Sequence, residues 1–341
     1  MLPPRAWVQG LLLPPSQYRS FLSVLLKEEE LPDTLLHLLR TRAGSAGRLR
    51  WADEVLRATR RHGGRVLVPA QSEYPRTLLN LHQPPPALFV RGNPQLLREE
   101  EKVAVVGTRR ASPDAKAAAS RLGRALAMAK LPVVSGLARG VDRFAHEGCL
   151  AGNGRPVAVL GTGFDEAYPP AHAELQEEVA RRGCLVSEYP PGTGARPWHF
   201  VARNRLIAAL ASLVVVVEAG KRSGALITAE FANELGREVM AFPGSAEDPA
   251  YEGCLALLKD GAGLARGASD VLQELGRHEA AEQLEIPLGL HRPLSPAEIA
   301  RMQGMELSRV LAELAQLEFE GQVRRVAGGR YLATGRSGGN S

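Results

Sequence analysis

The 341-residue sequence has only three cysteines and no apolar run long enough to cross a membrane. Cys149, Cys184 and Cys254 lie far apart without a CxxC pair, which excludes a disulfide framework and argues against a zinc site. A membrane helix needs about 20 consecutive apolar residues, and short apolar runs such as 213–217 suit a buried strand instead. The first residues lack the basic segment, apolar segment and small-residue cleavage site of a secretory signal, so we expect a cytoplasmic protein.

Lysine is also scarce, since only six of the 42 cationic residues are lysines. Arginine binds phosphate bidentately and stacks on bases, but a GC-rich genome produces the same bias, so the ratio decides nothing. The distribution of charge is more informative, because residues 1–84 carry a net +5, residues 85–287 a net −2 and residues 288–341 a net +2. If the middle section binds a polyanion, it must do so through a local cluster of cations.

Apolar segments alternate with helical patterns between residues 65 and 276. The helical patterns carry capping signals, of which Ser112-Pro113 is the clearest. Near-continuous apolar strands alternating with helices predict a mostly parallel sheet with helices on both faces. We therefore predict an α/β, Rossmann-like, doubly wound domain over 65–276. Its principal strands are expected at 102–106, 132–135, 156–160, 185–188, 213–218 and 238–242.

The flanking segments have different patterns. Residues 1–64 show helical periodicity interrupted by glycines and predict a small helical domain. Residues 277–287 are polar and irregular, as in a linker. Residues 288–335 begin with a capping box from Ser295 to Glu298, continue through two helices and end in two strands around Gly328-Gly329. That order predicts a winged helix.

The second helix of the predicted winged helix is acidic. From Glu306 to Glu320 its net charge is −3, which repels a phosphate backbone. We therefore expect a protein-contact or regulatory role for this domain rather than duplex reading, although its hairpin arginines are placed to touch phosphate.

Glycine-rich segments follow nearly every predicted strand of the middle domain. Ligands of open α/β sheets bind beyond the carboxyl ends of the strands, and glycine lets them approach the backbone. Two of these loops lead into helix N-termini near Val141 and Ala225, which favour anions. Cations gather at the same edge, so we predict an anion site. They are Arg109, Arg110, Arg139, Lys221, Arg222 and the Arg203-Asn204-Arg205 run.

Common nucleotide and catalytic motifs are missing from these loops. The absence of GxGxxG disfavours a dinucleotide cofactor, the absence of GxxxxGK[ST] excludes a P-loop ATPase, and the absence of GxSxG disfavours a serine hydrolase. Asp142, His146 and Glu218 are the only candidate metal ligands, and the first two fit a local polar pair better. We expect no cofactor and no metal.

Aromatic residues accompany the cations. The stretch from Trp198 to Arg205 interleaves both kinds, and Tyr168 and Tyr189 lie at nearby strand–loop junctions. Bases of single-stranded nucleic acid stack on such side chains, although a core position for Phe200 fits the pattern equally well.

These motifs together resemble the DNA-processing protein A family, DprA or Smf, over about residues 66–276. The resemblance implies a cytoplasmic, homodimeric, non-enzymatic protein that binds single-stranded DNA, protects incoming DNA and loads the RecA recombinase onto it during natural transformation. It also implies a helical module (SAM or helix-hairpin-helix-like) before the core and a winged helix after it. The matching stretches are 73–75, 84–93, 103–109, 135–142 with His146, 168–169, 187–188, 203–205, 217–219, 223–229 and 243–244.

The family's basic pocket corresponds by resemblance to several of the residues already named. These are Arg109, Arg139, Arg203 and Arg205, with Ser223, Gly224 and Thr228 in a glycine-rich wall; Arg110, Phe200, Asn204 and Lys221 complete the predicted DNA-binding set. Two positions depart from the family pattern. Val201 replaces a usual proline, and Leu255 replaces a usual asparagine.

One alternative of a different class remains open. The same fold plan resembles nucleotide-processing phosphoribohydrolases, which carry a glutamate near the late glycine motif, and here Glu230 follows 223–229. Release of a nucleobase from a nucleoside monophosphate, compared with gel retardation of an oligonucleotide, distinguishes the two.

Overall fold

The computed structural model describes residues 46–277, 293–303, 306–319 and 323–333. The chain divides into two compact units, Met1–His278 and Glu279–Ser341, and each is described by itself. Residues 1–45 of the expected helical domain, and all but the first residue of the expected linker, lie outside the described residues. No helix in the described part is long and apolar enough to cross a membrane.

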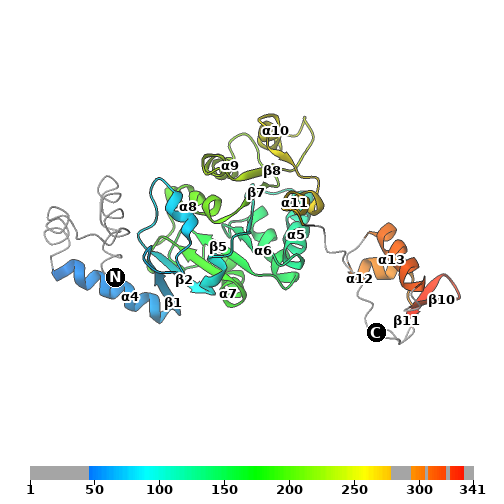
Figure 1. Cartoon of the computed structure of the whole chain (residues 1–341), viewed down its shortest axis with the longest axis horizontal. Helices are drawn as coiled ribbons and strands as arrows, with labels where there is room; N and C mark the ends of the chain where they lie inside the picture. The colour runs from blue at the N-terminus through cyan, green and yellow to red at the C-terminus, as the bar shows by residue number, and fades with distance from the viewer. Residues whose placement is uncertain (1–45, 278–292, 304–305, 320–322, 334–341) are drawn as a thin grey trace. The chain divides into compact units, whose positions relative to one another are not determined.

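One sheet organises the first unit (Figure 1). Its nine described strands have the order β1-β2-β6-β5-β4-β3-β7-β8-β9. Neighbours from β6 to β9 pair in parallel, whereas β1 and β2 are antiparallel at one edge. The predicted mostly parallel sheet is therefore confirmed. The strands are β1 Gly64–Leu67, β2 Leu88–Gly92, β3 Val103–Val106, β4 Val133–Ser135, β5 Pro156–Leu160, β6 Cys184–Ser187, β7 Leu213–Val216, β8 Glu238–Ala241 and β9 Gly263–Leu264.

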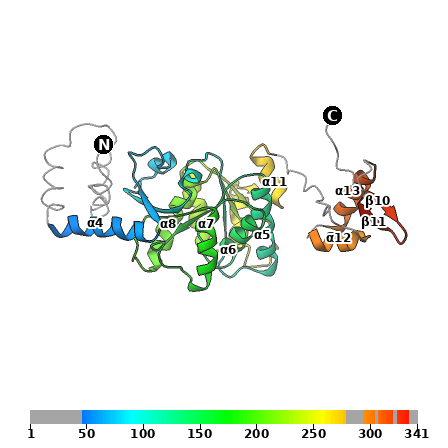
Figure 2. The ribbon, with the colours of Figure 1, turned by 90° about the horizontal axis from the view of Figure 1, so that it is seen from below.

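Helices cover both faces of this sheet. On one face lie α5 Pro113–Met128, α6 Val141–Ala151, α7 Ala173–Arg182 and α11 Ala268–Glu274, and Figure 2 shows α5, α6 and α7 in a row. On the other face lie α8 Pro197–Leu210, α9 Gly224–Glu234 and α10 Glu252–Lys259. Short 3-10 turns occur at η1 Arg76–Asn80, η2 Pro94–Leu97 and η3 Pro170–His172.

Alternate residues of each central strand enter different cores. In β3, Val103 and Val105 pack with α5 and α6, whereas Ala104 and Val106 pack with α8 and α9. Every residue of the strand is buried as a result, and this explains why the sequence shows continuous apolar runs rather than alternation.

Helix α4, Ala46–Arg61, is the described part of the segment expected to form a separate helical domain. Its Ala52 and Val55 are buried in a cluster that includes Phe89 of β2 and Phe164. The last helix of that segment therefore packs on the sheet domain.

The second unit contains two helices and a hairpin: α12 Pro296–Gln303, α13 Leu307–Phe319, β10 Val323–Val326 and β11 Arg330–Ala333. The predicted capping box is present, because the Ser295 N–H donates to Oε2 of Glu298 at 2.8 Å and the Glu298 N–H donates to Oγ of Ser295 at 3.3 Å. Gly328 and Gly329 lie in the loop between β10 and β11 with φ values of 78° and 65°, a conformation that glycine adopts readily. The winged helix is thus confirmed.

Candidate nucleic-acid interface

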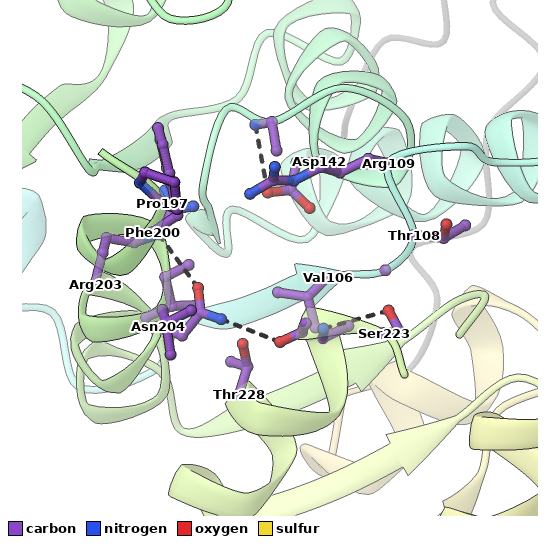
Figure 3. Close-up of a pocket in the computed structure, with 16 residues that line it drawn as sticks. Val106, Thr108, Arg109, Asp142, Pro197, Phe200, Arg203, Asn204, Ser223 and Thr228 are labelled. Carbon is purple, nitrogen blue, oxygen red and sulfur yellow. Dashed lines mark hydrogen bonds between the residues drawn. The ribbon is translucent and has the colours of Figure 1, made fainter. Parts of the chain in front are cut away.

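The candidate site lies where the direction of the sheet order reverses. Strand β3 has β4 on one side and β7 on the other. Along the chain, β4, β5 and β6 are added outward on the first side of β3, and β7, β8 and β9 are then added outward on the second side. Ligands of open α/β sheets bind in the crevice at such a point. A cavity of about 210 Å³ lies there, and Figure 3 shows its lining. It is lined by the end of β3 and the loop after it (106–109), by Ala138 after β4, by Asp142 in the first turn of α6, by residues of α8 between 197 and 207 and by residues at the start of α9 between 223 and 228.

Arg203 of α8 forms the buried base of this cavity. Its side chain is 3 % exposed, and its Nη1 donates to the carbonyl oxygens of Gly136, at 2.7 Å, and Val159. A Cβ at position 136 would lie 2.5 Å from this guanidinium, so only glycine allows the approach. Burial lowers the pKa of Arg203 to about 10, which leaves it charged at neutral pH. No hydrogen bond to a described residue occupies its Nη2, so a ligand has a donor there.

Asp142 fixes the loop after β4. Its Oδ2 accepts the N–H groups of Gly136, at 3.1 Å, and Ala138, at 3.4 Å. Burial raises the pKa of this carboxyl, and the charge of Arg203 opposes that shift. The carboxylate is engaged with the loop backbone rather than with His146, so the expected local polar pair is not what the structure shows.

Arg109 and Phe200 form the exposed wall of the cavity, and the Tyr168 ring lies beside Phe200, outside the lining. The Arg109 guanidinium carbon lies 5.3 Å from the centroid of the Phe200 ring, which lies 5.0 Å from the Tyr168 ring. Tyr168 is 42 % exposed. Cations attract ring faces, and bases stack on them, so this wall presents both a phosphate-binding group and stacking surfaces.

The start of α9 forms the opposite wall. Ser223 caps the helix, its Oγ accepting the Ala225 N–H at 3.4 Å, and Asn204 donates from Nδ2 to the Gly224 carbonyl at 3.1 Å. A Cβ on Gly224 would meet no atom within 4 Å, so this backbone is open to a ligand. Thr228 is buried one turn further along the helix. The helix N-terminus favours an anion at this wall.

A second cavity of about 190 Å³ shares Arg109, Ala138 and Phe200 with the first. Arg139 lines it, together with Tyr168 and the Pro169-Pro170 turn. The predicted residues thus separate into groups. Arg109, Phe200, Arg203, Asn204, Ser223, Gly224 and Thr228 line the first cavity, and Arg139 lines only the second.

Three residues of the predicted DNA-binding set line neither cavity, and the same is true of Arg222. Arg205 pairs with Glu188 and donates to the Gln83 carbonyl at 3.0 Å, so it ties α8 to the segment before β2. Lys221 pairs with Glu252 at 3.1 Å, and Arg110 is exposed beside the cavity. Arg205 and Lys221 lie outside both cavities for the same physical reason, because each side chain is paired with a carboxylate that does not line either cavity.

The two departures from the family pattern differ in position. Val201 is 48 % exposed and lines the first cavity, where it adds an apolar surface next to Phe200. Leu255 lies on α10 and lines neither cavity.

The residue required by the enzyme alternative lies elsewhere. Glu230 lines a different cavity, of about 480 Å³, with Arg237, Glu238 and Asp260. Glu218 accepts the Ser112 N–H at 3.2 Å. Within the described ranges, no group of three His, Cys, Asp or Glu side chains is arranged to hold a metal ion.

Three features around this site were not predicted from the sequence. Pro197 lines the first cavity, Tyr189 stacks on His199 with ring centroids 3.9 Å apart, and Arg196 lies over the exposed Trp198 ring at 5.6 Å. The interleaved aromatic and basic pattern pointed to the region but not to the pairs.

Comparison with known proteins gives a consistent result. The family model for DNA recombination-mediator protein A matches residues 65–276, and that for the DprA winged helix domain matches 288–329. The chain is 40% identical over 213 residues to Protein Smf of Synechocystis sp., a match covering 62% of this chain and 54% of that protein. It is 37% identical over 221 residues to DNA processing protein DprA of Bacillus subtilis, covering 65% of this chain and 74% of that protein.

Two solved structures share the fold. The X-ray structure of DNA processing protein A from Streptococcus pneumoniae superposes with a TM-score of 0.69 at 33% identity, covering 79% of this chain and 95% of that one. The second is the structure of DNA processing protein A from Helicobacter pylori, described as giving insight into a single-stranded DNA binding mode. It has a TM-score of 0.57 at 29% identity, covering 63% of this chain and 97% of that one. Because the family model spans more than half of the sequence, the chain belongs to the DNA recombination-mediator protein A (DprA/Smf) family.

Proposed function

We propose that this chain binds single-stranded DNA in the cavity between β3, β4, α8 and α9. The observation that carries the proposal is the arrangement of Arg109 over the Phe200 ring, beside Tyr168, at a switch-point cavity. A single strand offers both phosphates and free base faces to such a wall, whereas a duplex hides its base faces by stacking. The Helicobacter pylori relative, whose single-stranded DNA binding mode has been described, supports the choice of ligand.

We further propose that the chain acts as a mediator rather than an enzyme. In this role it protects incoming single strands and delivers them to the RecA recombinase during natural transformation, in the cytoplasm and as a homodimer. Family membership supports these finer points. A dimer carries one such cavity on each protomer. Once an oligonucleotide is long enough to reach both protomers, its second contact becomes intramolecular, so affinity is expected to rise in a step with oligonucleotide length.

A salt series of oligonucleotide binding tests the assignment of the cavity. Each phosphate contact contributes about 0.7 to the slope of log K against log salt for single strands. Arg109→Ala is expected to lower that slope by about this amount and to weaken binding. The matched control is Arg121→Ala, which removes an exposed arginine of α5 outside both cavities and is expected to leave the slope unchanged.

Two outcomes contradict the proposal. One is an Arg109→Ala variant that binds with wild-type affinity and slope. The other is release of a nucleobase from a nucleoside monophosphate by the purified protein, which would favour the phosphoribohydrolase alternative.

A further inference from the structure

A group of cations continues from the cavity over the N-terminal ends of α5 and α6. Lys116 lies in the first turns of α5, and Arg143 lies in the first turn of α6. Both approach the same ring: Nζ of Lys116 is 5.9 Å, and the guanidinium carbon of Arg143 is 5.6 Å, from the centroid of Phe144. Because ring faces attract cations, Phe144 holds two like charges within one small area of the surface.

Backbone contacts join this area to the cavity. The Val141 N–H donates to the Thr108 carbonyl at 3.3 Å, and a Cβ on Gly140 would lie 2.2 Å from that same oxygen. The loop with Arg109 and Arg110 therefore lies against the loop with Arg139. Arg139 lies in that second loop, two residues before α6 begins at Val141. We call Arg110, Lys116, Arg139 and Arg143 the basic band.

Carboxylate partners are few in the basic band. Several exposed cations outside it pair with acids, as Arg266 does with Asp270 at 2.7 Å and Lys221 with Glu252 at 3.1 Å.

Within the basic band only Arg143 has such a partner, Glu147 at 2.7 Å. Arg110, Lys116 and Arg139 form no ion pair with any residue that the structure describes. Neighbouring cations without counter-charges repel one another, and a polyanion laid across them removes that repulsion.

We propose that a single strand bound in the cavity continues over the N-terminal ends of α5 and α6, where the basic band binds its next phosphates. This inference rests on the proposed function, because the cavity anchors the strand. It makes the band important only for oligonucleotides long enough to leave the cavity. Lys116 and Arg143 then add affinity without contacting the nucleotides held by Arg109 and Phe200.

The test compares two lengths of oligothymidylate, one of about 4 nucleotides, at the low end of single-strand site sizes, and one of about 16. The variant is Lys116→Gln with Arg143→Gln. With the long oligonucleotide the salt slope is expected to fall by about 1.4, and affinity at physiological salt by about tenfold. With the short one both are expected to stay at wild-type values.

Two further variants serve as controls. Arg181→Gln with Arg182→Gln removes the same charge from the last turn of α7. This turn precedes the start of β6, so it lies at the amino ends of the parallel strands, opposite the carboxyl ends where the cavity lies. It is expected to leave both lengths unaffected. Lys116→Arg with Arg143→Lys keeps the charge and is expected to retain binding of the long oligonucleotide. Thermal melting by circular dichroism verifies that each variant is folded.

The outcomes separate the basic band from the cavity. A double-Gln variant that loses no more affinity than the α7 control, or that loses equally at both lengths, overturns the basic band while the cavity assignment stands. Wild-type binding of both lengths by Arg109→Ala overturns the proposed function, and the basic band with it.

Discussion

Replacement of Arg203 by methionine is expected to destabilise the protein strongly, although the residue lies at a binding cavity. Methionine keeps the apolar stem but removes the guanidinium that bonds to the Gly136 and Val159 carbonyls. It also leaves the buried Asp142 carboxylate without its opposing charge. Leaving a buried polar group without its hydrogen-bond partner costs about 1–3 kcal/mol for each group, a large part of the roughly 5–15 kcal/mol by which domains are stable.

Urea unfolding followed by circular dichroism at pH 7 measures the loss. Burial already raises the pKa of Asp142, and removing Arg203 raises it further. A carboxyl whose pKa is higher in the folded state penalises folding at high pH, and the penalty is relieved as pH falls through that pKa. The deficit of the Arg203→Met variant is therefore expected to shrink toward acidic pH.

A double-mutant cycle identifies the source of the loss. Asp142→Asn keeps an oxygen that accepts the Gly136 and Ala138 N–H groups but removes the charge. In the Arg203→Met background it is expected to restore part of the lost stability. Arg109→Ala, at an exposed position, is expected to change stability by no more than about 0.5 kcal/mol. Stability of Arg203→Met within about 1 kcal/mol of wild type, or no rescue by Asp142→Asn, would refute this reasoning.

Three further predictions concern other parts of the chain. His146 is fully buried, and burial lowers its pKa to about 3, so the unfolded chain binds its proton first as pH falls below about 6.5. Urea unfolding should show stability falling by up to about 1.4 kcal/mol per pH unit between pH 6 and 4, and His146→Met should flatten that slope. Gly140→Ala should cost about 1–3 kcal/mol more than Gly236→Ala in the same assay, because both have positive φ but only the first would clash, 2.2 Å from the Thr108 carbonyl. A chain ending at His278, where the first unit ends, should keep its affinity for single strands in gel retardation; a hundredfold loss, about 2.7 kcal/mol, would contradict the cavity assignment.

The sheet was predictable because its strands are buried on both faces and therefore appear as continuous apolar runs. Capping signals also fixed helix starts, as with Ser112, whose Oγ accepts the Ala115 N–H at 3.1 Å before α5. Strand β9 was missed because its two residues, Gly263 and Leu264, carry no periodic pattern. Helix α11, of seven residues, was missed for a similar reason.

The site was predictable in outline only. Glycines and cations after the strands located the edge of the sheet, but they did not separate Arg203, which lines the cavity, from Arg205, which pairs with Glu188. The partners of these two arginines could not be read from the local pattern, since Gly136 lies 67 residues from Arg203 and Glu188 lies 17 residues from Arg205. Such long-range contacts are set by packing rather than by local pattern.

A crystal structure of the full chain with a short oligothymidylate tests the central claim most directly. The account predicts a nucleotide in the cavity between β3, β4, α8 and α9, with a phosphate oxygen within about 2.7–3.2 Å of the Arg109 guanidinium and a base stacked on Phe200 or Tyr168. An oligonucleotide bound on the winged helix, or in the cavity lined by Glu230 and Arg237, with the Arg109 cavity empty, would contradict it.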